Sequence, residues 1–258
     1  MVARVIRGVA VAALAVVVTL PGAATPARAA GVDAIKKVGE VAFGLLLQSR
    51  QGELTEQQII QALQQFVGVV RDAESEIISH LDAVAAAPWV GAAQHAILEV
   101  PSLPLLAEDP LQDYALQVAL HARQAKSVFD AVEFGPEADH LGFAVASLYA
   151  VGLQARIAAG LGTTTYLPNY RTAMEAIVNR LEPQCSSREG DMDYHPSIYH
   201  VVHTCRTPYG DRTFQDYQVN GHWQEGPWTE ATLKAAAGAA TSWVVAKDVL
   251  QRMNNGGI

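Results

Sequence analysis

The sequence predicts a mainly α-helical protein, built as a multi-helix bundle with a small C-terminal antiparallel β-meander and a closing C-terminal helix. Three observations predict this class. Apolar residues recur at helical spacing over residues 32–182, alternate with polar ones over 198–219, and return to helical spacing over 229–253. We expect residues 30–183 to form the bundle. We expect residues 184–258 to form the meander and the last helix, packed on the bundle through a disulfide.

The composition indicates a folded chain and argues against a nucleic-acid partner. Of the 258 residues, 50% are hydrophobic and 17% are charged, a balance that excludes an intrinsically disordered protein. The formal net charge is −8. Since an acidic protein is repelled by a phosphate backbone, we expect no nucleic acid among its partners.

Residues 1–29 are expected to form a secretory signal peptide. Arg4 and Arg7 precede the apolar residues 8–20, and residues 27–29 have the small-x-small pattern of a cleavage site. The apolar run is too short to cross a bilayer as a helix, which takes about 20 residues. We therefore expect a secreted protein that is cleaved near Ala29, with an uncleaved anchor as the alternative.

The bundle should contain about five to six helices, each delimited by residues that start or stop a helix. Thr55 and Gln58 have the pattern of a capping box, and Asp109 is expected to be the N-cap before a first-turn proline, Pro110. Gly135 separates two helices. The expected ranges, in chain order, are 33–50, 55–87, 89–100, 109–132, 137–159 and 168–181.

The segment from Leu141 to Leu153 differs from the other helices because it holds no charge and is apolar on most faces. We interpret it as the central helix of the bundle, crowded on all sides. The alternative is a segment that inserts into a target membrane, as in soluble helical toxins. Four polar residues bracket the run too closely for a full span, so membrane contact is not favoured. They are Glu137, Asp139, His140 and Arg156.

Two segments with alternating polarity, 198–205 and 212–219, predict strands joined by a turn at 207–210. Asn220-Gly221 is the preferred two-residue hairpin turn, so residues 222–225 are expected to return as a third strand. With a two-residue first loop, one face carries Tyr199, Val201, His203, Cys205, Phe214 and Trp223. The other face carries His200, Val202, Gln215, Tyr217 and His222.

Cys185 and Cys205 are the only cysteines, and both follow the expected signal peptide. Because export permits oxidation, we expect a disulfide between them, with two free thiols as the alternative. Closing a loop of about 20 residues stabilises a fold by about 3 kcal/mol. We place Cys185 at a helix end, so that the bond attaches the face of the sheet with Cys205 to the bundle.

A candidate polar site consists of His200, His203, Asp216 and His222, in a histidine-rich segment that also holds His195. Imidazole is the commonest zinc ligand, but His200 and His203 are three positions apart and point to opposite faces of a strand. We therefore expect neither a metal site nor a cofactor.

His203 and Asp216 are diagonal neighbours in the expected meander, and we interpret them as a buried hydrogen-bonded pair. Ser197 lies on the same side but six positions from His203, too far for a hydrogen bond. The sequence has no nucleophile elbow, phosphate loop or zinc-protease motif. We therefore assign no catalytic residue.

Three stretches carry a resemblance to known sequences. They are EIISHLDAVAAAPWVGAAQHAILEV, DHLGFAVASLYAVGLQARIAAGL and YRTAMEAIVNRLEPQC. In these stretches the chain resembles a group of uncharacterised secreted helical proteins of high-GC Gram-positive bacteria. The resemblance implies export and a helical domain followed by a short cysteine-bearing tail, and it implies no activity.

The function we expect is that of a secreted, extracellular binding or interaction protein whose partner is an unknown protein or ligand. A candidate aromatic patch for binding consists of Tyr166, Tyr170, Trp223 and Trp228. Two alternatives stay open. One is a membrane-active, toxin-like effector, and the other is a hydrolase or metal enzyme that uses residues 195–222.

Overall fold

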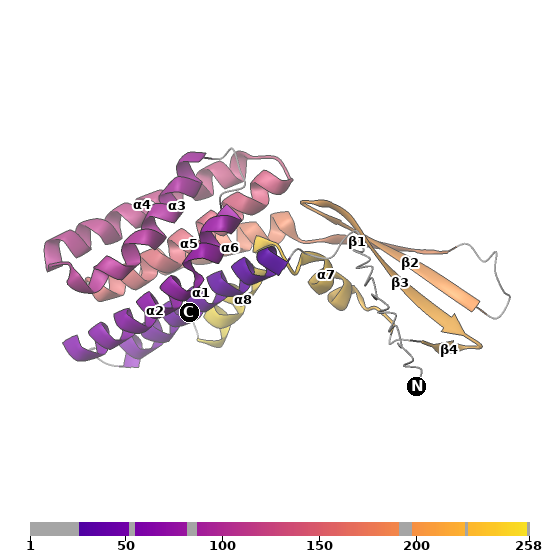
Figure 1. Ribbon diagram of the computed structural model, residues 1–258, viewed down its shortest axis with the longest axis horizontal. Coiled ribbons are helices and arrows are strands. Elements are labelled where there is room, and N and C mark those ends of the chain that lie inside the picture. The colour runs from indigo at the N-terminus through magenta and orange to yellow at the C-terminus, as the bar shows by residue number, and fades with distance from the viewer. Residues whose placement is uncertain (1–25, 52–54, 82–86, 191–197, 225–226, 257–258) are drawn as a thin grey trace, which may run out of the picture.

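The computed structural model describes residues 26–51, 55–81, 87–190, 198–224 and 227–256, and it shows a helical bundle from which a β-sheet projects (Figure 1). The bundle consists of α1 (Pro26–Gln51), α2 (Glu56–Leu81), α3 (Ala87–Glu99), a 3₁₀ segment η1 (Val100–Leu105), α4 (Glu108–Ala131), α5 (Pro136–Ala158), α6 (Tyr166–Leu181) and α8 (Ser242–Asn255). The projecting part consists of β1 (Gln184–Glu189), β2 (Ile198–Thr207), β3 (Gly210–Val219), β4 (His222–Trp223) and α7 (Glu230–Gly238). The predicted mainly α class with a C-terminal meander is confirmed.

Two sequence predictions fall wholly or mostly on residues that are not described. Residues 1–25, which make up most of the expected signal peptide, lie outside the described chain, and so does His195. The expected cleavage position at Ala29 falls in the first turn of α1.

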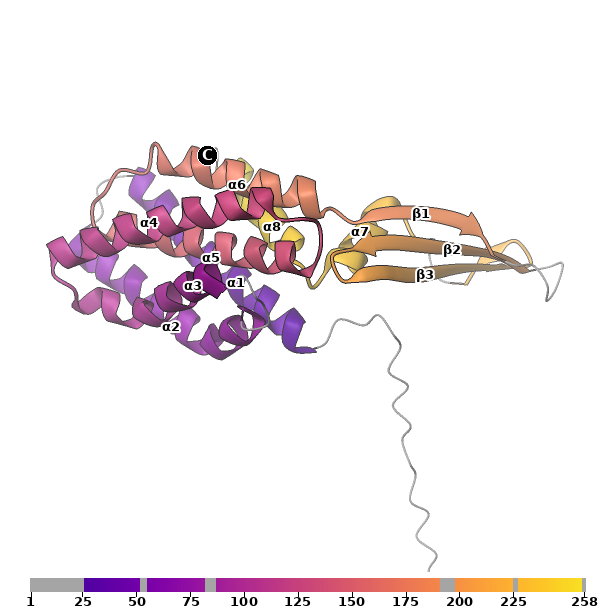
Figure 2. The same cartoon turned by 90° about the horizontal axis from the view of Figure 1, so that it is seen from above.

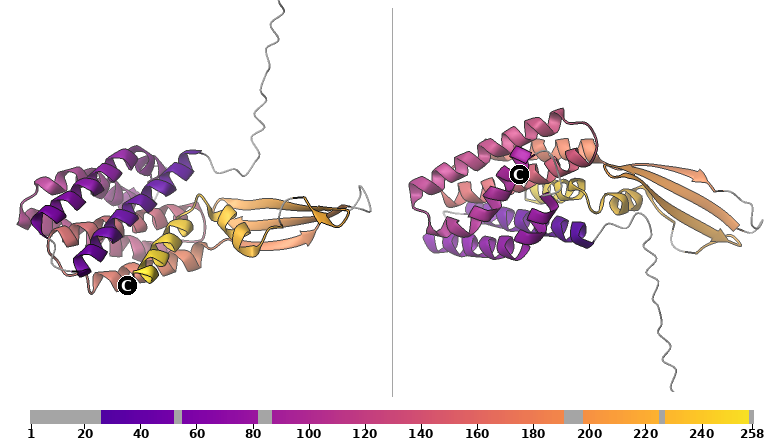
Figure 3. Two further views of the ribbon diagram at one scale, coloured as in Figure 1. Left: turned by 90° about the horizontal axis from the view of Figure 1, so that it is seen from below. Right: turned by 45° about the horizontal axis from the view of Figure 1, so that its top comes forward.

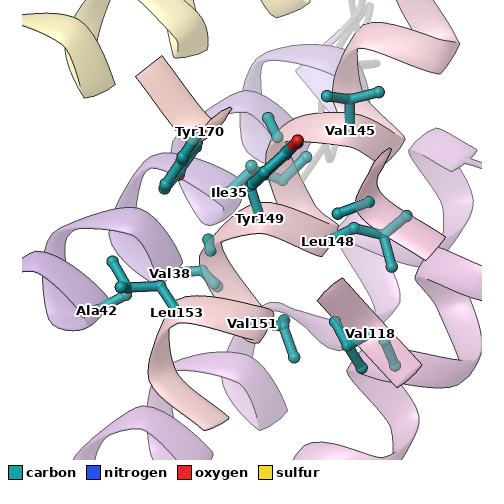
Figure 4. Close-up of a cluster of buried hydrophobic side chains, with 14 of the residues drawn as sticks. Ile35, Val38, Ala42, Val118, Val145, Leu148, Tyr149, Val151, Leu153 and Tyr170 are labelled. Carbon is teal, nitrogen blue, oxygen red and sulfur yellow. The ribbon is translucent and has the colours of Figure 1, made fainter. Parts of the chain in front are cut away.

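The helix α5 is the centre of the bundle, as the uncharged run predicted. Every residue from Ala138 to Ala155 is buried, and α5 contacts α1, α2, α3, α4, α6 and α8. Figure 4 shows Val151 facing Val118 of α4, while Leu153 lies beside Ala42 of α1. Within the described chain, α5 is the one helix long and apolar enough to span a membrane. Since 89% of that stretch is buried, it has the character of a core helix.

The observed N-terminal cap agrees with the sequence prediction for α2 and differs from it for α4. The backbone N–H of Thr55 donates to Gln58 Oε1 at 2.9 Å, and Gln58 N–H donates to Thr55 Oγ1 at 3.3 Å, which confirms the capping box. The predicted N-cap at Asp109 is wrong, because the N-cap of α4 is Ala107. Asp109 lies in the first turn, where a carboxylate complements the helix dipole.

The sheet has four antiparallel strands in the order β1-β2-β3-β4, one more than the sequence predicted. Thr207 pairs with Gly210 across the expected two-residue loop. Asn220 and Gly221 have φ values of 51° and 81°, as a type I′ turn requires. The additional strand is β1. Its residues are mostly polar and lack the alternation of polar and apolar residues that predicts a strand.

The disulfide is present, but it does not attach the sheet to the bundle. Cys185 lies in β1, directly opposite Cys205 of β2, so the bond joins two neighbouring strands. The expectation that Cys185 ends a helix was wrong, since α6 stops at Leu181. The face of the sheet that carries Cys205 packs on α7, through Leu233 and Ala237, and not on the bundle.

The sheet and α7 together form a projection that we call the arm. Figures 2 and 3 show the strands running away from the bundle, with α7 lying against their near end. The single closing helix predicted over 229–253 is divided into α7 and α8. The predicted start at Thr229 is correct, because its hydroxyl accepts a hydrogen bond from Thr232 N–H at 3.2 Å.

A buried carboxylate fixes the arm to the bundle. Asp139 Oδ1 on α5 accepts hydrogen bonds from Ser242 N–H at 2.7 Å and from the Ser242 hydroxyl at 2.9 Å. Asp139 Oδ2 accepts from the hydroxyl of Tyr209, in the β2–β3 turn, at 2.8 Å. One side chain of the central helix thus holds both the start of α8 and the base of the arm.

Candidate functional site

The four residues of the predicted aromatic patch do not form a common surface. Tyr166 and Tyr170 are buried in the bundle, with 1% and 0% of their surface exposed. Trp223 lies on β4 in the arm and is 38% exposed, while Trp228 packs on Phe214 with ring centroids 5.0 Å apart. The predicted patch is therefore wrong, because amphipathic Tyr side chains that were read as surface residues fill the core.

The predicted polar site also separates into parts. His200 and His203 point to opposite faces of β2, as expected, and His222 lies exposed on β4. Among the described residues there is no group of three or more His, Cys, Asp or Glu side chains that could hold a metal ion. Of the four predicted residues, only His203 and Asp216 come into contact.

His203 and Asp216 form the buried pair that the sequence predicted, and a serine extends it. His203 Nε2 lies 2.9 Å from Asp216 Oδ2, and the two residues are 6% and 5% exposed. On the other side of the ring, His203 Nδ1 lies 2.7 Å from the hydroxyl oxygen of Ser187. The backbone N–H of Trp228 donates to the same Asp216 oxygen at 2.9 Å. Ser187, His203 and Asp216 thus form one chain of hydrogen bonds from an exposed serine residue to a buried carboxylate.

The donor and acceptor of each hydrogen bond in this series follow from the chemistry of the carboxylate at its end. An ionised carboxylate only accepts hydrogen bonds, so the proton of a neutral His203 lies on Nε2. His203 Nδ1 is then an acceptor, and the Ser187 hydroxyl donates to it. This is the arrangement in which an imidazole can act as a general base toward a serine.

Ser187 is absent from the predicted site residues because its strand, β1, was not predicted. The strand reads Gln-Cys-Ser-Ser-Arg-Glu, which has neither β-branched residues nor alternation. One signal was present: if Cys185 opposes Cys205 in an antiparallel pair, then Ser187 must oppose His203. Ser197, the serine considered from sequence, lies outside the described residues.

The outer side of β1 is a free sheet edge in the part of the chain that the structure describes. Gly190 N–H donates to the carbonyl oxygen of His200 at 2.9 Å, which fixes the alternation of hydrogen bonds along the β1–β2 pair. The backbone groups of Arg188 therefore face β2, whereas those of Ser187 and Glu189 face the free edge. The nucleophile candidate thus also presents its own N–H at that edge.

Aromatic side chains cover both faces of the outer half of the arm. On the face away from α7, the His200 ring lies parallel to Tyr217, with centroids 4.5 Å apart and an interplanar angle of 1°. A Cβ on Gly190 would lie 2.1 Å from His200 Nδ1, so this stack requires glycine there. On the other face, Tyr199 and Trp223 meet edge to face at 6.2 Å.

The chain matches no protein-family model, no curated protein and no solved structure.

Proposed function

We propose that the chain is an exported binding protein whose arm engages an extended peptide segment of a partner protein along the free edge of β1. The observation that carries this proposal is the edge itself: it stands out from the bundle, and the backbone groups of Ser187 and Glu189 face outward. An extended peptide offers hydrogen-bonding groups at the same two-residue repeat, so it can add to the sheet as a further strand.

The side chains along β1 define the chemistry of the peptide. Arg188 lies on the face of the His200–Tyr217 stack, and Glu189 lies on the opposite face beside Tyr199. Residues that face each other across two strands interact when their charges are opposite. The preferred peptide therefore carries an acidic residue opposite Arg188 and, next to it, a basic residue opposite Glu189.

Export is part of this proposal and has support in the cysteine chemistry. The Cys185–Cys205 bond holds β1 in place beside β2, and such bonds persist in oxidising compartments. An extracellular binding edge gains from this covalent support, because β1 is short and polar.

The test uses peptide binding and two substitutions at one position. Random linear peptides are displayed and selected on the oxidised protein, and the affinity of an enriched peptide is measured for Glu189→Pro and Glu189→Ala. Both variants lose the side chain, but only proline removes the outward N–H, at a position where an edge strand tolerates it. We expect Glu189→Pro to weaken binding about tenfold or more relative to Glu189→Ala.

Two results would contradict peptide addition at β1. One is a selection on the wild-type protein that enriches no peptide. The other is equal affinity of an enriched peptide for the two Glu189 variants, because the peptide would then bind elsewhere. Circular dichroism of both variants confirms that the sheet is intact.

A further inference from the structure

We propose that Ser187 is the nucleophile of an acyl-transfer site, with His203 as its general base and Asp216 as the residue that positions His203. The substrate is a peptide bond presented along the edge of β1. The choice of a peptide rests on the proposed function, whereas the nucleophile rests only on the geometry of these three side chains.

The three residues have the burial that this chemistry requires. Ser187 is an exposed residue of the edge strand, while His203 and Asp216 are nearly inaccessible to water. The hydrogen bonds of 2.7 Å and 2.9 Å on the two ring nitrogens hold the imidazole between the hydroxyl and the carboxylate. Nδ1 and Nε2 are both competent bases, so a serine on Nδ1 and a carboxylate on Nε2 suit proton transfer.

The reaction is a two-step hydrolysis. The Ser187 hydroxyl passes its proton to His203 Nδ1 while its oxygen bonds to the carbonyl carbon of the peptide. The C–N bond breaks, and the departing amine takes the proton from His203. A water molecule then gives a proton to His203 and adds to the acyl-serine. The bond to the Ser187 oxygen breaks, this oxygen regains the proton, and a carboxylic acid leaves.

The sheet edge supplies a hydrogen-bond donor for the carbonyl oxygen of the substrate. The backbone N–H of Ser187 faces outward, on the same residue as the attacking oxygen. A peptide added to β1 would direct a carbonyl at this N–H. A backbone donor at that place stabilises the negative charge that develops on the oxygen during attack.

Asp216 acts through His203 and does not touch the substrate. Its carboxylate is fixed by the N–H of Trp228, at the point where the chain enters α7. Without this carboxylate His203 Nε2 loses its acceptor, so the tautomer with the proton on Nδ1 becomes populated. That tautomer cannot accept the proton of Ser187.

The test is covalent labelling of the folded, oxidised protein with a fluorophosphonate probe. An activated serine oxygen bonds to the phosphorus of this probe and displaces fluoride. We expect labelling at Ser187, located by mass spectrometry and abolished in Ser187→Ala. Ser186→Ala is the matched control, because Ser186 is also exposed on β1 but points to the opposite face. His203→Gln is expected to lower the labelling rate about a hundredfold or more.

Asp216→Ala removes the acceptor of Nε2 and has a readout that a merely structural role would not change. Nitrogen NMR of His203 is expected to show the proton on Nε2 in the wild type and a mixture of the two tautomers in the variant, together with a loss of labelling. An unchanged tautomer with unchanged labelling would remove Asp216 from the mechanism.

The remaining outcomes test the assignment of the nucleophile independently of the assignment of its substrate. No labelling of the folded wild-type protein, or equal labelling of wild type and His203→Gln, would overturn the proposal, because Ser187 would be an ordinary exposed serine. Labelling of Ser187 that depends on His203 supports the nucleophile even if no peptide binds at β1. In that case only the peptide substrate falls, together with the proposed function.

Discussion

Two buried tyrosines of α6 lie in the same core, but only one of them has a hydrogen-bond partner for its hydroxyl among the described residues. Tyr166 and Tyr170 both pack on Tyr149, with ring centroids 5.5 Å and 5.1 Å away. The Tyr166 hydroxyl donates to the carbonyl oxygen of Tyr149 at 2.9 Å, whereas the Tyr170 hydroxyl has no hydrogen-bond partner among the described residues. Burial raises the pKa of both phenols, so both remain neutral at physiological pH. The Tyr170 hydroxyl therefore lowers the stability of the fold.

Phenylalanine substitutions at these two positions should act in opposite directions. We expect Tyr170→Phe to raise the free energy of unfolding by about 1 kcal/mol, because it removes an unpaired buried polar group. We expect Tyr166→Phe to lower it by about 1 kcal/mol, because a hydrogen bond is lost. Urea unfolding of the oxidised proteins measures both values. Equal destabilisation by the two substitutions would show that the Tyr170 hydroxyl has a partner, such as a buried water.

For single residues, the sequence predicted which side chains pair across strands better than it predicted which side chains are buried. The pairing of His203 with Asp216 follows from strand register, which alternation and turn residues specify. The burial of Tyr166 and Tyr170 does not follow from any local pattern, because a tyrosine suits a core or a surface equally well. Which of the two it joins depends on helices that lie far away in the sequence.

Glycines in α5 let neighbouring elements approach the central helix closely. A Cβ on Gly142 would lie 2.2 Å from the hydroxyl oxygen of Ser242, and one on Gly152 would lie 2.3 Å from that of Tyr166. Glycine inside a helix costs about 1 kcal/mol relative to alanine. These two positions keep glycine because a side chain would collide with α8 or α6.

Alanine at position 152 should therefore destabilise the bundle. The main collision of its Cβ is with the hydroxyl oxygen of Tyr166. We expect Gly152→Ala to lower the free energy of unfolding by about 2 kcal/mol, within the range for overpacked cores. Adding Tyr166→Phe removes the colliding oxygen, so the double variant should be more stable than the sum of the single effects predicts. A double-mutant cycle in urea measures this coupling.

Gly44 of α1 provides the matched control. Nothing lies within 4 Å of a Cβ built there, so helix propensity alone decides the effect. Gly44→Ala should stabilise the protein by about 1 kcal/mol. Strictly additive effects of Gly152→Ala and Tyr166→Phe would contradict the collision.

The division of the C-terminal helix shows why some element boundaries escape a sequence analysis. Residues 229–253 have one continuous helical pattern, yet the chain turns between α7 and α8. The start of α8 is fixed by Asp139, which accepts from the Ser242 backbone and is 103 positions away in the sequence. A long-range hydrogen bond of this kind leaves no local signal, whereas the Thr229 cap, which is local, was predictable.

At the scale of the whole molecule, the bundle and the arm meet at a small joint (Figure 1). Asp139 forms its centre, and the ring of the adjacent His140 lies 6.0 Å from that of Tyr209. Lys234 of α7 bonds Glu182, just after α6, at 3.0 Å, and the Arg206 guanidinium lies 5.1 Å from the ring centroid of Phe134. The exposed ion pair contributes little, because water screens it. Among the polar contacts of the joint, we therefore expect the buried carboxylate to contribute most to the orientation of the arm.

Two substitutions at this joint should separate folding of the bundle from placement of the arm. Asp139→Ala leaves the Ser242 N–H and the hydroxyls of Ser242 and Tyr209 without their acceptor, so we expect a loss of about 3 kcal/mol or more in the free energy of unfolding. Tyr209→Phe removes the bond between Asp139 and the arm, keeps the bonds of Asp139 to Ser242, and should cost about 1 kcal/mol.

Amide hydrogen exchange distinguishes the two effects, because it reports local opening as well as global unfolding. In Tyr209→Phe the β2–β3 turn should exchange faster, while α5 and the start of α8 keep their protection. In Asp139→Ala all three regions should exchange faster, since Asp139 bonds both Ser242 and Tyr209. If Asp139→Ala left the turn as protected as in the wild type, the arm would be held by its other contacts. The edge of β1 would then owe its position to the packing of α7 and not to the carboxylate of α5.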